Sequence, residues 1–167
     1  MNTRELAGGG MMASAIVALL LISVPFPSLS LTCAGIAGLC VLFTLVRWNV
    51  RTATLCYITA SVLSLLLLPR RDAAFEFMLL FGPYACVQEL LFSRIKGTLL
   101  VWVCKAIYFN SLLAILIGSY RFLFAMPVVV VKELYFIVPL ANVAFILWDI
   151  AFTKFLLHAR KRYRSIG

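Results

Sequence analysis

The chain of 167 residues has little of what soluble enzymes use for chemistry. It contains 6 acidic residues and a single histidine, His158, at the end of a long apolar run. A lone imidazole without a carboxylate, serine or cysteine partner argues against nucleophilic catalysis and against a metal site. We therefore expect that the protein is not an enzyme and holds no cofactor.

A phosphate-binding glycine loop is also missing. The run Gly8-Gly9-Gly10 lacks the following lysine and serine or threonine, and it leads directly into an apolar segment. If the protein depends on ATP hydrolysis, a partner has to supply it.

The 5 cysteines do not form a disulfide or metal-binding pattern. They are scattered one or two to an apolar run, with no close pair and no histidine at ligand spacing. We interpret them as small, buried apolar residues: Cys33, Cys40, Cys56, Cys86 and Cys104.

Apolar sequence is what the chain has in abundance, at 64% hydrophobic residues and a mean hydropathy of +1.07. A bilayer core about 30 Å thick needs roughly 20 apolar residues in a helix. The runs here are continuous rather than alternating, which favours helices over a β-barrel. We predict an all-α, polytopic bundle in one transmembrane domain over 1–167, with a basic tail at 159–167. Its six helices would cover about 6–24, 29–46, 52–68, 73–92, 98–119 and 132–158.

Prolines punctuate this pattern. Pro25 and Pro27 end the first run, which we interpret as a retained helix and not as a cleaved signal peptide. Gly82-Pro83 predicts a kink inside the fourth helix, and Pro139 a bend in the sixth. The segment 120–131 is open to three interpretations: a loop that covers the outer mouth, a short interfacial helix or part of a longer helix.

The basic residues lie mostly at helix ends. An even number of helices places both termini on one side, together with the basic 47–51 and 94–96 connectors and the tail. The positive-inside rule puts that side in the cytoplasm, so we predict a multi-pass protein of a bacterial inner (cytoplasmic) membrane. The net charge of +9 then indicates contact with anionic membrane lipid and not with nucleic acid.

Among the charged residues inside the apolar runs, where a charge is costly, the most informative are Glu89, Lys105 and Asp149. Counting from the cytoplasmic ends places all three in the inner third of the bilayer. We expect an intramembrane charge network in which Glu89 pairs with Lys105 on the next helix. Such a network either holds helices together or relays protons or ions.

Uncharged polar residues lie nearer the centre of the last three helices. Tyr84 and Gln88 share one helix face because they are four residues apart. They form either an interhelical hydrogen-bond network or the lining of a small-molecule pocket. As a substrate-binding set we name Tyr84, Gln88, Tyr108, Asn110 and Asn142.

Small residues recur at a four-residue spacing in the first three helices, which are almost free of charge. Such stripes allow close helix approach, within the bundle or against a partner subunit. As a candidate partner-docking set we name Gly10, Ser14, Ala18, Ala60 and Ser64.

These features together resemble the substrate-binding S components of energy-coupling-factor transporters. The resemblance covers the whole chain and is architectural, with local support from the stretches 8–15, 81–84 and 105–110. It implies docking of helices 1–3 on a transmembrane coupling subunit that works with ATPase subunits. It also implies an outward-facing solute pocket in helices 4–6. The chain departs from the family's Ala-x-x-x-Ala pattern and lacks recognisable signatures for known ligands.

The resemblance predicts an S-component-like protein that binds a small solute for uptake driven by partner ATPases. Two alternatives remain open. One is a structural or assembly subunit of a membrane complex that carries no solute. The other is a proton-coupled carrier.

Overall fold

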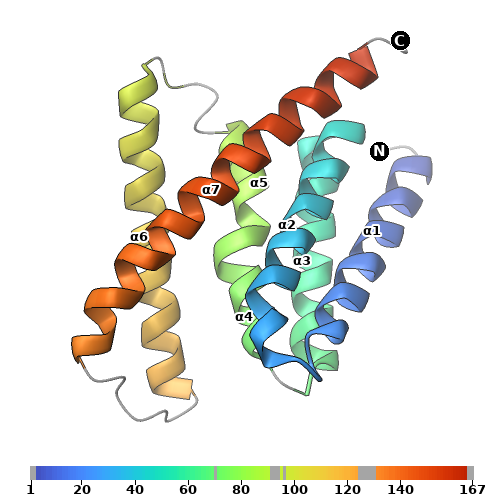
Figure 1. Ribbon diagram of the computed structural model, residues 1–167. Coiled ribbons are helices and arrows are strands. Elements are labelled where there is room, and N and C mark those ends of the chain that lie inside the picture. Colours follow the sequence, from blue (N-terminus) through green and yellow to red (C-terminus); the bar gives the residue numbers. More distant parts are fainter. Residues whose placement is uncertain (1–2, 70, 91–94, 96, 124–130, 165–167) are drawn as a thin grey trace.

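The computed structural model describes residues 3–69, 71–90, 95, 97–123 and 131–164, and all regular elements in these ranges are helical (Figure 1). The elements are α1 (Thr3–Ile22), the short 3-10 helix η1 (Pro27–Leu29), α2 (Ser30–Arg47), α3 (Val50–Leu67), α4 (Asp72–Glu76), the π-helical segment η2 (Phe77–Phe81), α5 (Gly82–Leu90), α6 (Thr98–Leu123) and α7 (Val131–Arg164).

Five of these helices are long and apolar enough to cross a membrane. Their spans are Thr3–Ile22, Ser30–Arg47, Val50–Leu67, Thr98–Ser119 and Val138–Ala159. Large apolar side chains cover the outside of the bundle, and Met11, Leu66, Leu99 and Phe136 are each 76–81% exposed. A soluble protein would bury such residues, so these are the features of a multi-pass membrane protein.

The centre of the bundle is α2, which contacts α1 and α3 on one side and α4, η2, α5 and α7 on the other. Its buried face carries small residues that let these neighbours approach. At Gly38 an added Cβ would lie 3.0 Å from the backbone oxygen of Phe81, and at Gly35 it would lie 3.3 Å from Nε1 of Trp148. The two chain ends lie at the same end of the bundle, and α7 crosses the other helices diagonally (Figure 1).

The expected kink at Gly82-Pro83 takes the form of a π-helical segment immediately before the proline. Pro83 has no backbone N–H, and its ring crowds the preceding turn. The N–H of Gly82 bonds to the carbonyl of Phe77 rather than to that of Met78, which is the wider spacing of a π-helix. The freed Met78 carbonyl accepts a 2.9 Å hydrogen bond from the hydroxyl of Tyr57 on α3.

We expect Tyr57→Phe to lower the free energy of unfolding by about 1 kcal/mol, because the Met78 carbonyl loses its donor. Thermal unfolding in a mild detergent measures this. As a control, the same substitution is made in the Pro83→Ala variant. There the N–H of Gly82 can bond to the Met78 carbonyl, so we expect Tyr57→Phe to change the free energy of unfolding very little. An equal cost in both backgrounds would contradict this explanation of the π-helical segment.

The helix boundaries follow the sequence prediction closely at the first three helices and differ later in the chain. Helix α6 continues to Leu123, which removes the loop interpretation for the start of 120–131. The rest of that segment, with Pro127, lies outside the described residues. Helix α7 runs through Pro139 without a break and continues to Arg164, so much of the expected basic tail is helical.

Candidate functional site

A buried ion pair and a tyrosine that is hydrogen-bonded to it connect three helices: Tyr84 on α5, Lys105 on α6 and Asp149 on α7. Nζ of Lys105 lies 2.9 Å from both carboxylate oxygens of Asp149. The hydroxyl of Tyr84 donates a hydrogen bond to Oδ1 of the same carboxylate. Lys105 is 5% exposed, Asp149 2% and Tyr84 0%, so the cluster is shielded from the surroundings of the bundle.

Aromatic rings enclose this cluster. The ring of Tyr84 meets those of Phe145, Trp148 and Phe152 of α7 edge-on, with centroids 5.1–5.6 Å apart. On α6, Nζ of Lys105 lies 5.6 Å from the ring centre of Trp102. Edge-to-face rings are a favourable arrangement, and they fix the direction of the tyrosine hydroxyl. The site is therefore rigid and apolar around three polar groups.

Two polar atoms next to this cluster have no hydrogen-bond partner among the described residues: Oε1 of Gln88 and Nε1 of Trp148. Gln88 follows Tyr84 by one helical turn, and Trp148 directly precedes Asp149. Buried polar atoms are nearly always paired, and an orphan often marks the place of a water or ligand. One acceptor on α5 and one donor on α7 thus lie close to the cluster in sequence, and the donor, Nε1 of Trp148, faces Gly35 of α2.

The depths expected for the charges in the bilayer stay predictions. Asp149 lies midway along the candidate span Val138–Ala159. Lys105 lies nearer the Thr98 end of its own span. The partner that the structure shows for Lys105 is Asp149. Glu89 is half-buried near the end of α5, and its pairing with Lys105 stays a prediction.

Two further layers join α6 to α7 beside the ion pair. Phe109, one turn after Lys105 on α6, stacks on Phe145, one turn before Asp149 on α7. Their ring centroids are 4.2 Å apart. Next to this layer, Asn110 and Asn142 exchange hydrogen bonds of 2.9 and 3.1 Å. The two antiparallel helices therefore hold one register through three consecutive contacts.

We expect Asn110→Leu and Asn142→Leu each to destabilise the protein, because each leaves the other amide without its partner in an apolar setting. A double-mutant cycle should give a coupling of about 0.6–1.7 kcal/mol, the range of interhelical hydrogen bonds in membranes. Ser111→Leu is the control, since Ser111 is exposed and its hydroxyl donates to the carbonyl of Ile107 in its own helix. A coupling near zero would show that the amide pair does not stabilise the bundle.

The named binding residues thus fall into two groups that share the α6–α7 contact. Tyr84 belongs to the ion-pair cluster, Asn110 and Asn142 to the amide layer, and Tyr108 lies beside Tyr84 with ring centroids 6.2 Å apart. The sequence analysis did not identify the aromatic enclosure. Its signal is the spacing of Phe145, Trp148 and Phe152 around Asp149, which places all three near one helix face.

The small-residue stripes separate in the structure. On α1, Gly10, Ser14 and Ala18 are exposed on the outside of the bundle. On α3, Ala60 and Ser64 are fully buried against neighbouring helices. Only the α1 residues are therefore available to a partner.

Comparison of the chain with models of protein families, with curated proteins and with solved structures gives no match. The function has to be argued from the arrangement of these residues.

Chemically, the cluster offers an ammonium, a carboxylate and a phenol hydroxyl inside an apolar helix bundle. The carboxylate of Asp149 receives three hydrogen bonds from the two donors, which offsets part of its desolvation. The arrangement can hold a charged or strongly polar group if Asp149 releases one of its donors. It can equally hold three helices together as it stands.

Proposed function

We propose that the protein is a substrate-binding membrane subunit of the S-component type, which takes up a small polar solute from outside with energy from partner ATPases. The observation that carries this proposal is the division of the chain into two unlike halves. The buried charged side chains of the described residues, Lys105 and Asp149, meet beside Tyr84 of α5, whereas the stretches 6–46 and 52–68 contain no charged residue. Charged residues inside membrane-spanning helices are costly, and they commonly mark solute or ion pathways.

The proposal includes a sixth crossing of the membrane. α4, η2 and α5 follow one another without interruption from Asp72 to Leu90, which is about the length that a bilayer core requires. With six crossings both termini lie on one side. Arg47, Arg51 and Lys161 belong to that side, which supports a cytoplasmic location of the termini in the inner membrane.

The solute site would be built around Tyr84 and Lys105. Asp149 accepts hydrogen bonds from both donors, and Oε1 of Gln88, one turn from Tyr84, has no partner among the described residues. A solute with its own anionic group can take over the donors from the aspartate. Tyr108 and the amide layer of Asn110 and Asn142 would complete the lining.

The docking face for a coupling subunit would be the outer side of α1. Gly10, Ser14 and Ala18 are exposed there at a four-residue spacing, which allows another helix to approach closely. Replacing Ser14 and Ala18 with leucine would obstruct such a contact without touching the core.

Affinity purification of the tagged protein from its native membrane, with mass spectrometry of the eluate, tests the proposal. We expect a coupling subunit and ATPase subunits in the eluate, and their loss from the Ser14→Leu/Ala18→Leu variant. A control variant, Leu99→Ala, alters an exposed residue on α6 and should retain them. Thermal unfolding against a panel of small polar solutes then identifies the ligand by stabilisation, which Asn110→Leu should weaken.

One observation favours a second candidate, a structural subunit of a membrane complex. The Lys105–Asp149 pair is satisfied by Tyr84 within the chain and needs no ligand to complete it. Recovery of unrelated membrane proteins, together with no stabilisation by any solute, would favour this candidate and contradict the transporter proposal.

A further inference from the structure

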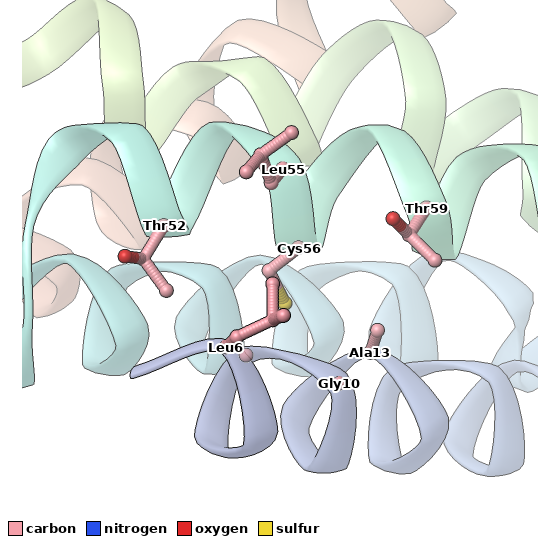
Figure 2. A pocket seen from close by; sticks show the side chains of 8 residues that line it. Leu6, Gly10, Ala13, Thr52, Leu55, Cys56 and Thr59 are labelled. Atoms are coloured by element: carbon pink, nitrogen blue, oxygen red, sulfur yellow. The ribbon is translucent and has the colours of Figure 1, made fainter. Parts of the chain in front are cut away.

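A lipid-facing groove of about 200 Å³ lies between α1 and α3 near the ends at which both helices begin (Figure 2). Eight residues line it: Leu6, Gly9, Gly10, Ala13, Thr52, Leu55, Cys56 and Thr59. A cavity of about 150 Å³ already accommodates benzene, so the groove can take a segment of hydrocarbon chain. An added Cβ at Gly10 would meet nothing within 4 Å, which shows that this part of the groove is empty of protein atoms.

Arg51 places a positive charge at the mouth of the groove, where the first turn of α1 also contains Arg4 and Glu5. Arg51 lies in the first turn of α3, is exposed, and shares a helix face with Leu55 of the groove one turn on. A cation at a helix N-terminus opposes the helix dipole, and the first turn of α3 contains no acidic residue to compensate it. An anion bound at this end would remove the conflict.

Hydrogen-bond donors are also available at this end. The first backbone N–H groups of a helix have no acceptor within the helix, and Asn49 at the cap position of α3 makes no side-chain hydrogen bond to them. Thr52, which lines the groove, is 1% exposed, and its hydroxyl has no hydrogen-bond partner among the described residues. Figure 2 shows that its oxygen is turned toward the end where α1 and α3 begin.

We propose that this groove binds one anionic glycerophospholipid. Its phosphate would accept hydrogen bonds from the start of α3 and pair with Arg51, and an acyl chain would follow the groove past Gly10. The charged mouth and the apolar floor match the two parts of such a lipid, and both lie at the membrane surface that we assign to the cytoplasmic side. A partner helix would fill the apolar floor but leave the donors and Arg51 without an acceptor. The site shares Gly10 with the docking face proposed for α1 but no residue with the ion-pair cluster, so lipid binding can persist where solute binding fails.

Native mass spectrometry of the purified full chain, titrated with phosphatidylglycerol or phosphatidylcholine, tests the proposal. We expect tighter binding of phosphatidylglycerol. Arg51→Gln should weaken it about fivefold, the effect of one basic residue near a membrane surface. Lys161→Gln, which removes a charge at the same end of the bundle, should leave it unchanged. Soluble glycerol phosphate should not compete, because it lacks the chain that the groove holds.

Gly10→Leu tests the groove itself by filling it. We expect the loss of the bound phosphatidylglycerol with unchanged thermal unfolding in lipid-free detergent. The matched control is Gly118→Leu on α6, where an added Cβ also meets nothing within 4 Å. Equal binding of the two lipids, full retention of lipid by Gly10→Leu, or competition by glycerol phosphate would each overturn the proposal. Because Ser14 and Ala18 lie outside the groove, failure of the lipid site is distinguishable from failure of partner docking.

Discussion

We expect Asp149→Leu to lower the free energy of unfolding by about 3–5 kcal/mol, the cost of leaving one member of a buried ion pair without the other. Lys105 would keep its buried ammonium near the ring of Trp102 but lose the carboxylate of Asp149, and Tyr84 would lose the hydrogen bond to that carboxylate. Lys105→Met should cost a similar amount, because it leaves the carboxylate uncompensated. Unfolding of the purified protein by a graded denaturing detergent, followed by tryptophan fluorescence, measures both effects.

The double variant Lys105→Met/Asp149→Leu should recover most of the lost stability, because apolar residues of similar size often replace a buried ion pair at little cost. The Tyr84 hydroxyl still loses its hydrogen bond to Asp149, at a cost of about 1 kcal/mol that Tyr84→Phe removes. Lys154→Met, an exposed lysine on the same helix, is the control and should stay within about 0.5 kcal/mol of the wild type. If the double variant is less stable than either single one, the pair does not act as an isolated unit.

The double variant also separates the functional proposals. If the ion pair only holds helices together, a stable double variant should keep its protein partners and any activity. If Lys105 and Asp149 belong to the solute site, the same stable variant should lose solute binding while it still purifies with its partners. Measurements of stability and of binding on this one variant thus distinguish the two proposals.

We expect Gly82→Ala to destabilise the protein by about 1–3 kcal/mol, the usual cost of overpacking a close contact. An added Cβ at Gly82 would lie 2.5 Å from two ring carbons of Tyr57 and 2.9 Å from the backbone oxygen of Phe77. The backbone oxygen cannot move independently of the π-helical segment, and displacement of the ring would break the hydrogen bond from Tyr57 to Met78. Thermal unfolding in mild detergent gives the size of the effect.

Two other helical glycines are controls for this experiment. An added Cβ at Gly10 or Gly118 meets nothing within 4 Å, so Gly10→Ala and Gly118→Ala should be neutral or stabilising by up to about 1 kcal/mol through helix propensity. If Gly82→Ala lowers the free energy of unfolding no more than these two substitutions do, the ring of Tyr57 can move aside without loss. That result would contradict a tight packing of α3 against α5.

Continuous apolar runs and prolines were enough to locate the long helices, because in a membrane the length of an apolar run determines whether it can span. The partner of Lys105 could not be derived in the same way. Pairing of Lys105 with Asp149 depends on how far α6 is shifted along α7. Stacked aromatic rings set this register, and the sequence alone does not show which rings stack on each other. The same holds for Tyr57, whose acceptor exists only because the helix before Pro83 adopts π-helical spacing.

The layered contact between α6 and α7 restricts how this protein can change shape. Sliding one helix past the other by a single turn, about 5.4 Å, would break the ion pair, the stacked rings and the amide pair at once. Intermediate positions would satisfy none of the three. Helices α6 and α7 therefore move together as one rigid body. Any opening of the bundle has to occur where these two helices meet α2 and α5, and it must break the hydrogen bond from Tyr84 to Asp149.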